Sequence, residues 1–555
     1  MRPSQKLVYT SYQTTGQRRD HVGWSPMQKS PQRTDAAMLN HPISRRMFNV
    51  SLGASALAAL TRSALAQANT APSKGGRLRV MLQETASSSL LDPTKVASWS
   101  VYFAYAIIGE TLVGIDSRLN PVPMLAASWE PVKNKVDDWV FKLRRGVEFH
   151  NGKSLTAKDV IFSLNRLRDP TLQSPLRDLL EHITDIIEED THTLRITLSR
   201  PDADFPLLLA QDRFYIFPEG FSTFDKPVGT GPFVADGLNP AGVNVYRRNQ
   251  NYWQNGKPYL DEVAFQGNQD PVARVSALLA GDVDAVQTIN FTLAKRIAAT
   301  SGFQVVSSTS GVHNVVAMLT DTAPFDRPEV REALKHLFDR EQMRDRLCAG
   351  HAQIGNDHPI PPFSSFYHTE LPVRPYDPER ARSILQKAGV DFPTQVLHAS
   401  DAVTPGVAVD LAQIYADGAR KAGISLEPKR DPVTGYWDNV WLKQPLMVGG
   451  WGTRFTPDLM LRVAYRSGAK WNETHWSRPK VDAMMDEAVA TTDVNRRREL
   501  YWAIQETIHY DGGAGIPLFF NQLDAISTRV KGVSPSPLGS LTGPAMADLW
   551  LDQGA

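Results

Sequence analysis

Cysteine is almost absent from this chain of 555 residues, which contains only Cys348. A single thiol cannot form an internal disulfide, and it excludes a metal site built from several cysteines. Cys348 follows Leu347 in a helical apolar pattern, which indicates a small buried side chain. The sequence therefore offers no thiol chemistry.

Motifs for catalysis and nucleotide binding are also missing. The chain has no Gly-x-x-x-x-Gly-Lys-Ser/Thr phosphate loop, no Gly-x-Ser-x-Gly nucleophile turn and no His-Glu-x-x-His zinc helix. His351 and His358 lie near Asp357, but a polar loop beside several prolines explains them better than a metal site. We expect no catalytic residue, no metal and no cofactor.

Only one apolar run stands out, Val50–Leu60, and it follows Ser44–Phe48 (Ser-Arg-Arg-Met-Phe) and precedes Ala64–Ala66. The run is rich in small residues, whereas a membrane-spanning helix needs about 20 strongly apolar ones. This order of features predicts a twin-arginine export signal that is cleaved near Ala66, and hence a periplasmic protein. The alternative is a cytoplasmic protein with a basic tail.

Neither sign of charge dominates, since the chain has 60 basic and 59 acidic residues. Residues 1–66 hold nine Lys or Arg and two Asp, so the expected mature chain keeps 51 basic and 57 acidic residues, a formal net charge of −6. A mildly acidic chain does not favour nucleic-acid binding, and we expect no nucleic-acid partner. Its length predicts two or three domains.

The pattern after the signal is mixed α/β. Alternation of polar and apolar residues predicts three strands, Arg77–Leu82, Trp139–Leu143 and Thr193–Leu198. A capping box at Thr156–Asp159 predicts the start of one helix, and Asp377-Pro378 predicts the start of another that ends at Gly389. Apolar stripes after Val330 and Val481 predict two more buried helix faces.

Seven motifs occur in a fixed order along the chain: Lys74–Val80, Leu91–Pro93, Gly109–Val113, Pro123–Glu130, Phe141–Gly152, Ala157–Ser163 and Gly229–Phe233. Together they resemble the extracellular solute-binding proteins of the peptide/nickel class, the ligand receptors of bacterial ABC importers. The resemblance runs from about Gly75 to the C-terminus. It implies two α/β lobes that close like a clamp, with a discontinuous larger lobe and two hinge strands near Val305–Ser310 and Gly515–Phe520.

The resemblance also implies an organisation and a function. Residues 1–66 would be extension and signal, 67–308 and 516–555 the large lobe, and 309–515 the small lobe. The protein would capture a peptide or peptide-like solute in the periplasm and deliver it to an inner-membrane permease with its ATPase subunits. Members of the family are generally monomers. An exported enzyme is the rival interpretation, but the sequence lacks its signatures.

Tryptophan is concentrated between Tyr436 and Trp476, where five of the twelve lie: Trp437, Trp441, Trp451, Trp471 and Trp476. Flat rigid rings suit binding surfaces because they give contact area at little entropic cost. Trp437 and Trp441 are four residues apart, which favours packing on one helix face. For Trp451, beside bare glycine backbone, and for Trp476, we expect ligand contact.

Ligand contacts are therefore expected from two regions. The predicted loop Trp471–Trp476 contributes bulky and polar side chains, and the tight turn Gly229–Pro232 belongs to the family motifs. The full set of expected ligand-binding residues is Trp451, Arg454, Asp458, Trp471, Asn472, His475, Trp476, Thr230 and Gly231.

Arg454 marks a departure from the family pattern. Peptide-binding members typically carry Trp-x-x-Asp where this chain has Trp451–Arg454, and their Asp neutralises the ammonium group of a peptide. A guanidinium instead forms a bidentate pair with a carboxylate or phosphate. An opine, an oligosaccharide or another anionic or polyhydroxylated solute is thus an alternative to a peptide. Asp458 offers a site for a cationic group, or an ion pair with Arg454 itself.

Overall fold

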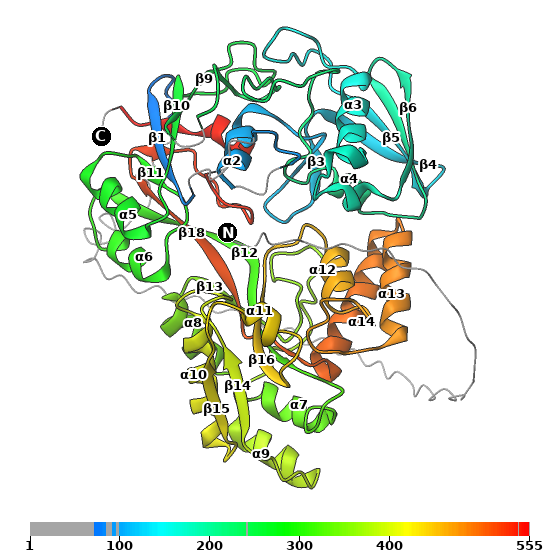
Figure 1. The fold of residues 1–555 in the computed structure, drawn as a ribbon, viewed down its shortest axis with the longest axis vertical. Helices are drawn as coiled ribbons and strands as arrows, with labels where there is room; N and C mark the ends of the chain where they lie inside the picture. Colours follow the sequence, from blue (N-terminus) through cyan, green and yellow to red (C-terminus); the bar gives the residue numbers. More distant parts are fainter. Residues whose placement is uncertain (1–70, 85–90, 96–98, 240–241, 542, 554–555) are drawn as a thin grey trace, which may run out of the picture. The chain divides into compact units, whose positions relative to one another are not determined.

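A twelve-stranded mixed sheet runs through the part of the chain that the computed structural model describes, residues 71–84, 91–95, 99–239, 242–541 and 543–553 (Figure 1). Its strand order is β15-β14-β16-β12-β18-β11-β1-β10-β9-β8, with β13 paired to β18 and β17 to β12. All these strands belong to the unit Pro72–Ala555.

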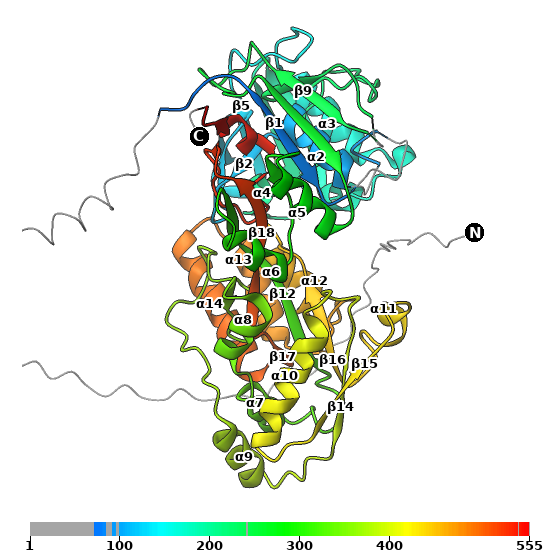
Figure 2. The ribbon, with the colours of Figure 1, turned by 90° about the vertical axis from the view of Figure 1, so that its left-hand side faces the viewer.

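The centre of this sheet is the antiparallel pair β12 (Phe303–Met318) and β18 (Leu518–Ser527). The two strands run together from one part of the molecule to the other, as Figures 1 and 2 show. Their register shifts between Ser308 and Val312, which marks a bulge in the ladder. The expected crossing at residues 305–310 lies within β12, and the expected crossing at 515–520 covers β17 (Ala514–Gly515) and the start of β18.

We use the name large lobe for residues 72–302 and 528–553, and small lobe for residues 319–517. The large lobe contributes five strands to the long sheet: β1 (Arg77–Leu82), β8 (Phe233–Ala235), β9 (Asn244–Arg248), β10 (Glu262–Gly267) and β11 (Ala285–Val286). Three helices accompany them: α2 (Trp99–Ile108), α5 (Pro271–Ala280) and α6 (Phe291–Ala298).

A separate antiparallel sheet in the large lobe has the order β4-β5-β7-β6. Its strands are β4 (Ala126–Val132), β5 (Lys135–Leu143), β7 (Thr193–Leu198) and β6 (Ile183–Asp190). The helices α3 (Ala157–Arg168) and α4 (Phe205–Leu208) contribute buried apolar residues to the same core. The short strands β2 (Val113–Ile115) and β3 (Pro121–Pro123) form a hairpin beside it.

The small lobe adds β13 (Ala352–Ile354), β14 (Gln395–Ala399), β15 (Leu426–Arg430) and β16 (Leu446–Trp451). Its helices are α7 (Pro328–Lys335), α8 (Arg340–Cys348), α9 (Pro378–Lys387), α10 (Ala408–Lys421), α11 (Tyr436–Asn439), α12 (Pro457–Ala464), α13 (Pro479–Ala490) and α14 (Val494–Asp511). The chain ends with the strand pair β19 (Val530–Lys531) and β20 (Trp550–Leu551).

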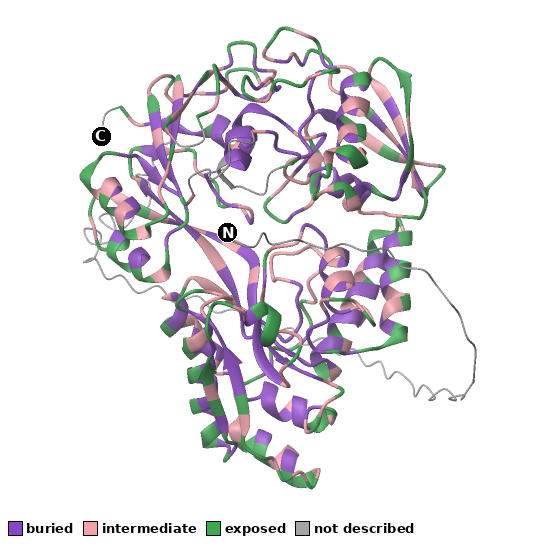
Figure 3. Ribbon diagram, in the orientation of Figure 1, coloured by how far each residue is buried: buried purple, intermediate pink, exposed green. Residues whose placement is uncertain are grey.

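The strand β12 is buried on both faces in the small lobe (Figure 3). Val316 and Met318 join the core formed with α7, α8 and α10, whereas Val315 and Ala317 join the core formed with α12, α13 and α14. Successive side chains of a strand point to opposite faces, so one strand serves two cores. A continuous apolar sequence is the expected result.

The local patterns of the sequence are confirmed. The three predicted strands are β1, part of β5 and β7, and α3 begins where the Asp159 carboxylate accepts hydrogen bonds from the Thr156 backbone and hydroxyl. The α9 helix begins at Pro378 and is capped by Asp377, whose carboxylate accepts from the Arg380 N–H. Cys348 is buried, and burial raises the pKa of its thiol to about 12.

One packing expectation was wrong. The helix α11 ends at Asn439, so Trp437 and Trp441 do not share a helix face, and Trp437 is 40% exposed. Their rings still meet edge to face at 5.4 Å. The turn that follows the helix brings Trp441 inward, where its indole N–H reaches a buried carboxylate.

The two lobes also contact each other away from β12 and β18. The Asp204 carboxylate pairs with Arg497 of α14 at 2.5 Å, and the Ala203 N–H donates to the Val489 carbonyl at 2.7 Å. Elsewhere, the Ser365 hydroxyl donates to the side-chain oxygen of Asn120 at 3.0 Å. None of the helices in the described ranges combines the length and apolar character that a membrane span requires.

Candidate ligand-binding site

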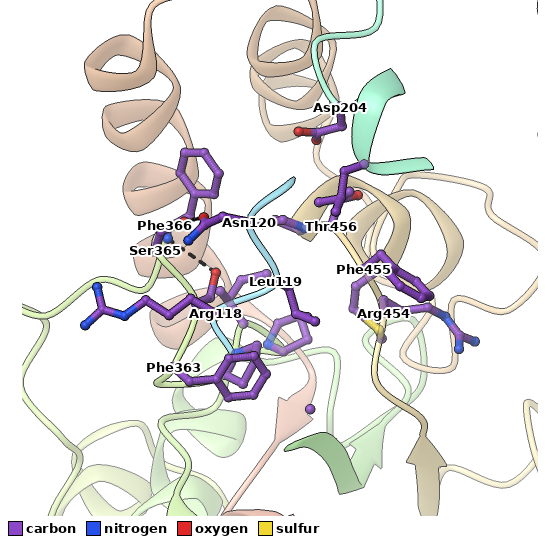
Figure 4. Close-up of a pocket in the computed structure, with 18 of the residues that line it drawn as sticks. Arg118, Leu119, Asn120, Asp204, Phe363, Ser365, Phe366, Arg454, Phe455 and Thr456 are labelled. Atoms are coloured by element: carbon purple, nitrogen blue, oxygen red, sulfur yellow. Dashed lines mark hydrogen bonds between the residues drawn. The ribbon is translucent and has the colours of Figure 1, made fainter. Parts of the chain in front are cut away.

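A cavity of about 300 Å³ lies between the lobes (Figure 4). The large lobe lines it with residues 118–121 and with Ala203, Asp204 and Leu207. The small lobe contributes residues 359–361, 363–366, 452 and 454–457, with further side chains from α12 and α14. Its volume lies at the lower end of the range for small-molecule sites, roughly 300–1,000 Å³.

The connection from β16 to α12 carries the central part of this wall. Thr456 caps α12 by accepting a hydrogen bond from the Leu459 N–H at 3.0 Å, and Pro457 occupies the first helical position. The Thr453 hydroxyl accepts from the Gly311 N–H of β12 at 3.0 Å. The connection is thus held at both ends, and Arg454 lies between these two anchors.

Arg454 is among the residues that line the cavity, and its contact with a ligand stays a prediction. Its guanidinium lies 5.7 Å from the ring centre of Trp451, within the range of a cation–π contact. Figure 4 shows Arg454 and Asp204 at well-separated positions around the site. The charge that Arg454 brings is therefore set against an aromatic face and not against that carboxylate.

Glu473 holds the tryptophans in place. This residue is 3% exposed, and its carboxylate accepts the Trp451 indole N–H at 2.5 Å and the Trp441 indole N–H at 2.7 Å. Burial raises the pKa of Glu473 to about 7, although the two indole donors act in the opposite direction. Glu473 fixes the orientation of Trp451 and thereby of the surface on which Arg454 rests.

The charged side chains that line the cavity are Arg118, Arg454, Arg497 and Asp204. The wall thus carries three arginines and one aspartate, and Asp204 pairs with Arg497. The remaining ionisable group, His313, is buried, and burial lowers its pKa to about 4 with a contribution from the Arg454 charge. The electrostatic balance of the wall thus favours an anionic ligand.

Asp458 is placed differently from the sequence expectation. Its carboxylate pairs with Arg462, one turn further along α12, at 2.7 Å. The two side chains face each other because residues four apart on a helix are neighbours. Asp458 is not among the residues that line the cavity, and the expectation that it contacts a ligand stays a prediction.

The loop Trp471–Trp476 is confirmed as a loop, but its side chains serve the small lobe itself. Trp476 is 1% exposed and donates to Asp511 at 2.9 Å, which places it in the core and not in the cavity wall. The Asn472 amide donates to the Trp476 carbonyl at 2.6 Å. His475, near the surface, meets Asp321 at 2.9 Å, and the Trp471 ring packs on Trp451.

Thr230 and Gly231 lie in the large lobe and not in this cavity wall. The Thr230 hydroxyl donates to the buried Glu110 carboxylate at 2.9 Å, and the Gly231 N–H donates to the Ile108 carbonyl at 2.7 Å. A β-carbon on Gly231 would come within 2.6 Å of that carbonyl oxygen. This close approach explains why the turn requires glycine there.

Asp357 belongs to a structural ion-pair cluster. Asp357 is fully buried and pairs with Arg340 at 2.8 Å and Arg374 at 3.1 Å. The His351 ring meets the Ser307 hydroxyl at 3.1 Å, away from that cluster. Within the ranges that the structure describes, no group of three or more His, Cys, Asp or Glu side chains is arranged to hold a metal ion.

Of the nine residues expected to contact ligand, Arg454 alone lines the cavity, and Trp451 supports it. Sequence reasoning missed His313, Asp204, Arg497 and Asn120, which come from four separate segments. No local pattern in the sequence marks them. Glu473 could have been found from the sequence, because it is a single acidic residue in a segment rich in tryptophan.

A cavity between two α/β lobes joined by paired strands defines the class: a two-lobed solute-binding protein. The chain belongs to the bacterial extracellular solute-binding proteins, family 5, whose middle-region model matches residues 120–473. The resemblance seen in the sequence is thereby confirmed. The protein is the substrate-binding component of an ABC importer.

Three relatives illustrate the similarity. Heme-binding protein A of Haemophilus influenzae is 29% identical over 75% of this chain and 82% of its own length. Glutathione-binding protein GsiB of Escherichia coli K12 is 26% identical over 74% of this chain and 83% of its own. The solved structure of the PBP AgaA with agropinic acid, from A. tumefaciens R10, has a TM-score of 0.66 at 24% identity over 86% of this chain and 99% of that one.

The packing of Glu473 against Gly449 gives a test by substitution. A β-carbon at Gly449 would overlap the Glu473 carboxylate, whereas a β-carbon at Gly452 would lie 3.8 Å from the nearest atom, in Arg454. Gly449→Ala should lower the free energy of unfolding by about 1–3 kcal/mol, a typical cost of overpacking. Gly452→Ala is the control and should be nearly neutral in the same urea titration. Equal stability of the two variants would contradict this packing.

The raised pKa of Glu473 predicts a pH dependence. Between the ordinary pKa of 4.5 and the folded value of about 7, the native state holds a proton that the unfolded state has lost. The contribution of Glu473 to the free energy of unfolding therefore decreases as the pH rises through this window. In urea titrations, the free energy of unfolding of wild type relative to that of Glu473→Gln should be lower at pH 8 than at pH 5. Exposed Glu427→Gln is the control; a wild type that gains stability relative to Glu473→Gln between pH 5 and pH 8 would refute the assignment.

Proposed function

We propose that this protein captures a small anionic solute, of the peptide-like or the polyhydroxylated class, in the cavity between its lobes. Arg454 carries the proposal, because it replaces the acid that peptide-binding members present to an ammonium group. In our proposal the guanidinium pairs with a carboxylate or phosphate of the solute. The composition of the wall, with three arginines and one aspartate, supports the same sign of ligand.

Contacts from both lobes support a clamp mechanism. The ion pair Asp204–Arg497 and the hydrogen bond Ser365–Asn120 join the lobes at the cavity wall. A ligand that touches both walls stabilises the closed state in proportion to its difference in affinity for the closed and open states. The closed form would then be the one that an inner-membrane permease and its ATPase subunits accept. We place the hinges at residues 308 and 515, so that 67–308 and 516–555 move against 309–515.

Two ligand classes remain candidates, each on its own observation. The glutathione-binding relative, at 26% identity, favours a peptide-like solute, which would be bound through its own carboxylate group. Arg454 at the position of the peptide-binding acid favours an opine or another polyhydroxylated acid instead. The modest cavity volume favours a single small molecule in either case. A thermal-shift screen with peptides, opines, oligosaccharides and nickel chelates separates these classes, because a ligand at a hundredfold excess over Kd adds about 2.7 kcal/mol of stability.

The proposal includes a binding role without catalysis, and a monomeric mature protein in the periplasm. The relatives are solute-binding proteins. An exported redox enzyme would show a visible absorption band from its cofactor after purification, and we expect none. The proposed export signal and its cleavage near Ala66 lie outside the residues that the structure describes.

Arg454→Ala should weaken binding of an anionic solute found by that screen by about 30-fold or more. Truncating one partner of a buried charge pair costs about 2–5 kcal/mol, and each 1.4 kcal/mol is tenfold in Kd. Titration calorimetry measures the change, with Arg466→Ala as the control because that arginine pairs with Asp486 and does not line the cavity. An unchanged Kd in Arg454→Ala would remove the basis of the proposal.

Replacing both Arg45 and Arg46 by Lys should stop export and leave the protein in the cytoplasmic fraction. Lysine keeps the positive charge of arginine, so the variant tests recognition of the arginine pair itself and not its charge. Such export signals are recognised by a receptor. Cell fractionation followed by immunoblotting gives the result. The matched control is an adjacent pair nearer the start of the sequence, Arg18 and Arg19, whose replacement by Lys should leave export intact. Periplasmic protein from the first variant would contradict the proposed signal.

A further inference from the structure

A second cavity, of about 180 Å³, lies within the large lobe. Helix α2 forms one side of it, and the short helix Gly543–Asp548 lies beside α2 in Figure 1. The remaining walls come from strand β2 with its flanking residues and from the segment that follows α4. Among the described residues, none lines both this cavity and the one between the lobes. The large-lobe cavity is therefore a separate candidate site.

The charged side chains of this wall are both acidic, Glu110 and Asp212, and no Lys, Arg or His of the described chain lines the cavity. Glu110 is 1% exposed, and its carboxylate accepts the hydroxyl of Thr230 at 2.9 Å and that of Tyr252 at 2.8 Å. The Trp253 indole N–H donates to the same carboxylate. Glu110 is thus already bonded to three protein donors and serves to hold the wall together.

Asp212 differs from Glu110 because its carboxylate lacks a counter-ion. The Oδ1 atom accepts a hydrogen bond from the Gln211 amide, and Asp212 forms no ion pair within the described residues. The side chain is only partly buried, so it keeps exposed surface while it lines the cavity. Burial raises the pKa of Asp212, against the neighbouring Arg213 charge and the Gln211 hydrogen bond. A cation in the cavity would offset the cost of removing this charge from water.

Two tyrosines of the wall, Tyr102 and Tyr215, are affected by the Asp212 charge. Burial, with a contribution from that charge, raises the pKa of both hydroxyl groups, so both rings remain neutral phenols. A neutral aromatic ring attracts a cation to its face. The rest of the wall is largely apolar, with Ala106, Ile115, Met124, Ala210 and Leu538. One carboxylate, two aromatic rings and an apolar surround suit an ammonium group on a short alkyl chain.

We propose that the large-lobe cavity binds a small primary amine as its ammonium ion, which pairs with the Asp212 carboxylate beside the rings of Tyr102 and Tyr215. This inference goes beyond the proposed function, since it concerns another cavity and the opposite sign of ligand charge. An anion would be repelled by the acidic wall, and a neutral alcohol would leave Asp212 without a counter-ion. The small volume limits the ligand to a short chain.

Titration calorimetry at pH 7 with n-butylamine and 1-butanol tests the inference, because the two share one carbon chain and only the amine is charged. An alkyl ammonium titrates near the lysine value of about 10.4 and is therefore protonated at this pH. Wild type should bind the amine at least about tenfold more tightly than the alcohol. Asp212→Asn keeps the shape of the side chain but removes the charge, so it should lose that preference. Asp225→Asn, at an exposed acid of the same lobe, is the control and should keep it.

A second variant locates the amine even if Asp212→Asn does not fold. Ala545 is partly exposed and lines the cavity, so the larger side chain of Ala545→Leu should occupy the space and abolish amine binding without altering Asp212. Arg454→Ala should bind the amine as wild type does, because Arg454 lines the other cavity.

The outcomes separate this inference from the proposed function. Equal affinity of wild type for amine and alcohol, or binding of neither, overturns the inference and leaves the proposed anion site intact. Amine binding that persists in Asp212→Asn or in Ala545→Leu, or that is lost in Arg454→Ala, places the amine elsewhere and also overturns it. If the amine preference behaves as expected while Arg454→Ala binds the anionic solute as wild type does, the proposed function falls and the amine site stands.

Discussion

The antiparallel pairing of β12 with β18 is the constraint on which the rest of the structure depends. These strands connect the lobes and lie at the middle of the long sheet, so the backbone hydrogen bonds between them hold both lobes in one frame. Side chains alternate along a strand, and a slip of one residue would move His313 from the cavity face into the opposite core. The neighbouring pair β12–β16 transmits the same register to Trp451. The position of the site is therefore a consequence of strand register.

Burial of Glu473 is the second feature that shapes the site. The nearby donors are two indoles and not a cation, and burial raises the pKa of the carboxyl to about 7. Such a group orders its neighbours at some cost in stability at neutral pH. The benefit lies in the fixed ring of Trp451, against which Arg454 is held. A rigid support of this kind lowers the entropy that ligand binding would otherwise lose.

The sequence predicted those features that depend on neighbours in the chain. Alternation and capping residues placed β1, β7, α3 and α9, since these signals act within a few residues. The sequence did not predict which side chains interact with each other. Asp458 had two arginines within four residues, and only the helix geometry of α12 selected Arg462. Trp476 resembled a ligand contact in composition, but its indole meets Asp511, on a helix that begins 18 residues further on.

What the sequence by itself determined about this protein is its family, the mixed α/β class, the local elements and the unusual Arg454. Only the tertiary structure decided which side chains share the cavity. Asp204 and Arg497 are 293 residues apart, and His313 comes from a third segment. Their proximity follows from strand pairing and lobe contact, which are long-range interactions without a local signature. The physical reason for this division is that propensity and periodicity act along the chain, whereas a binding site is assembled across it.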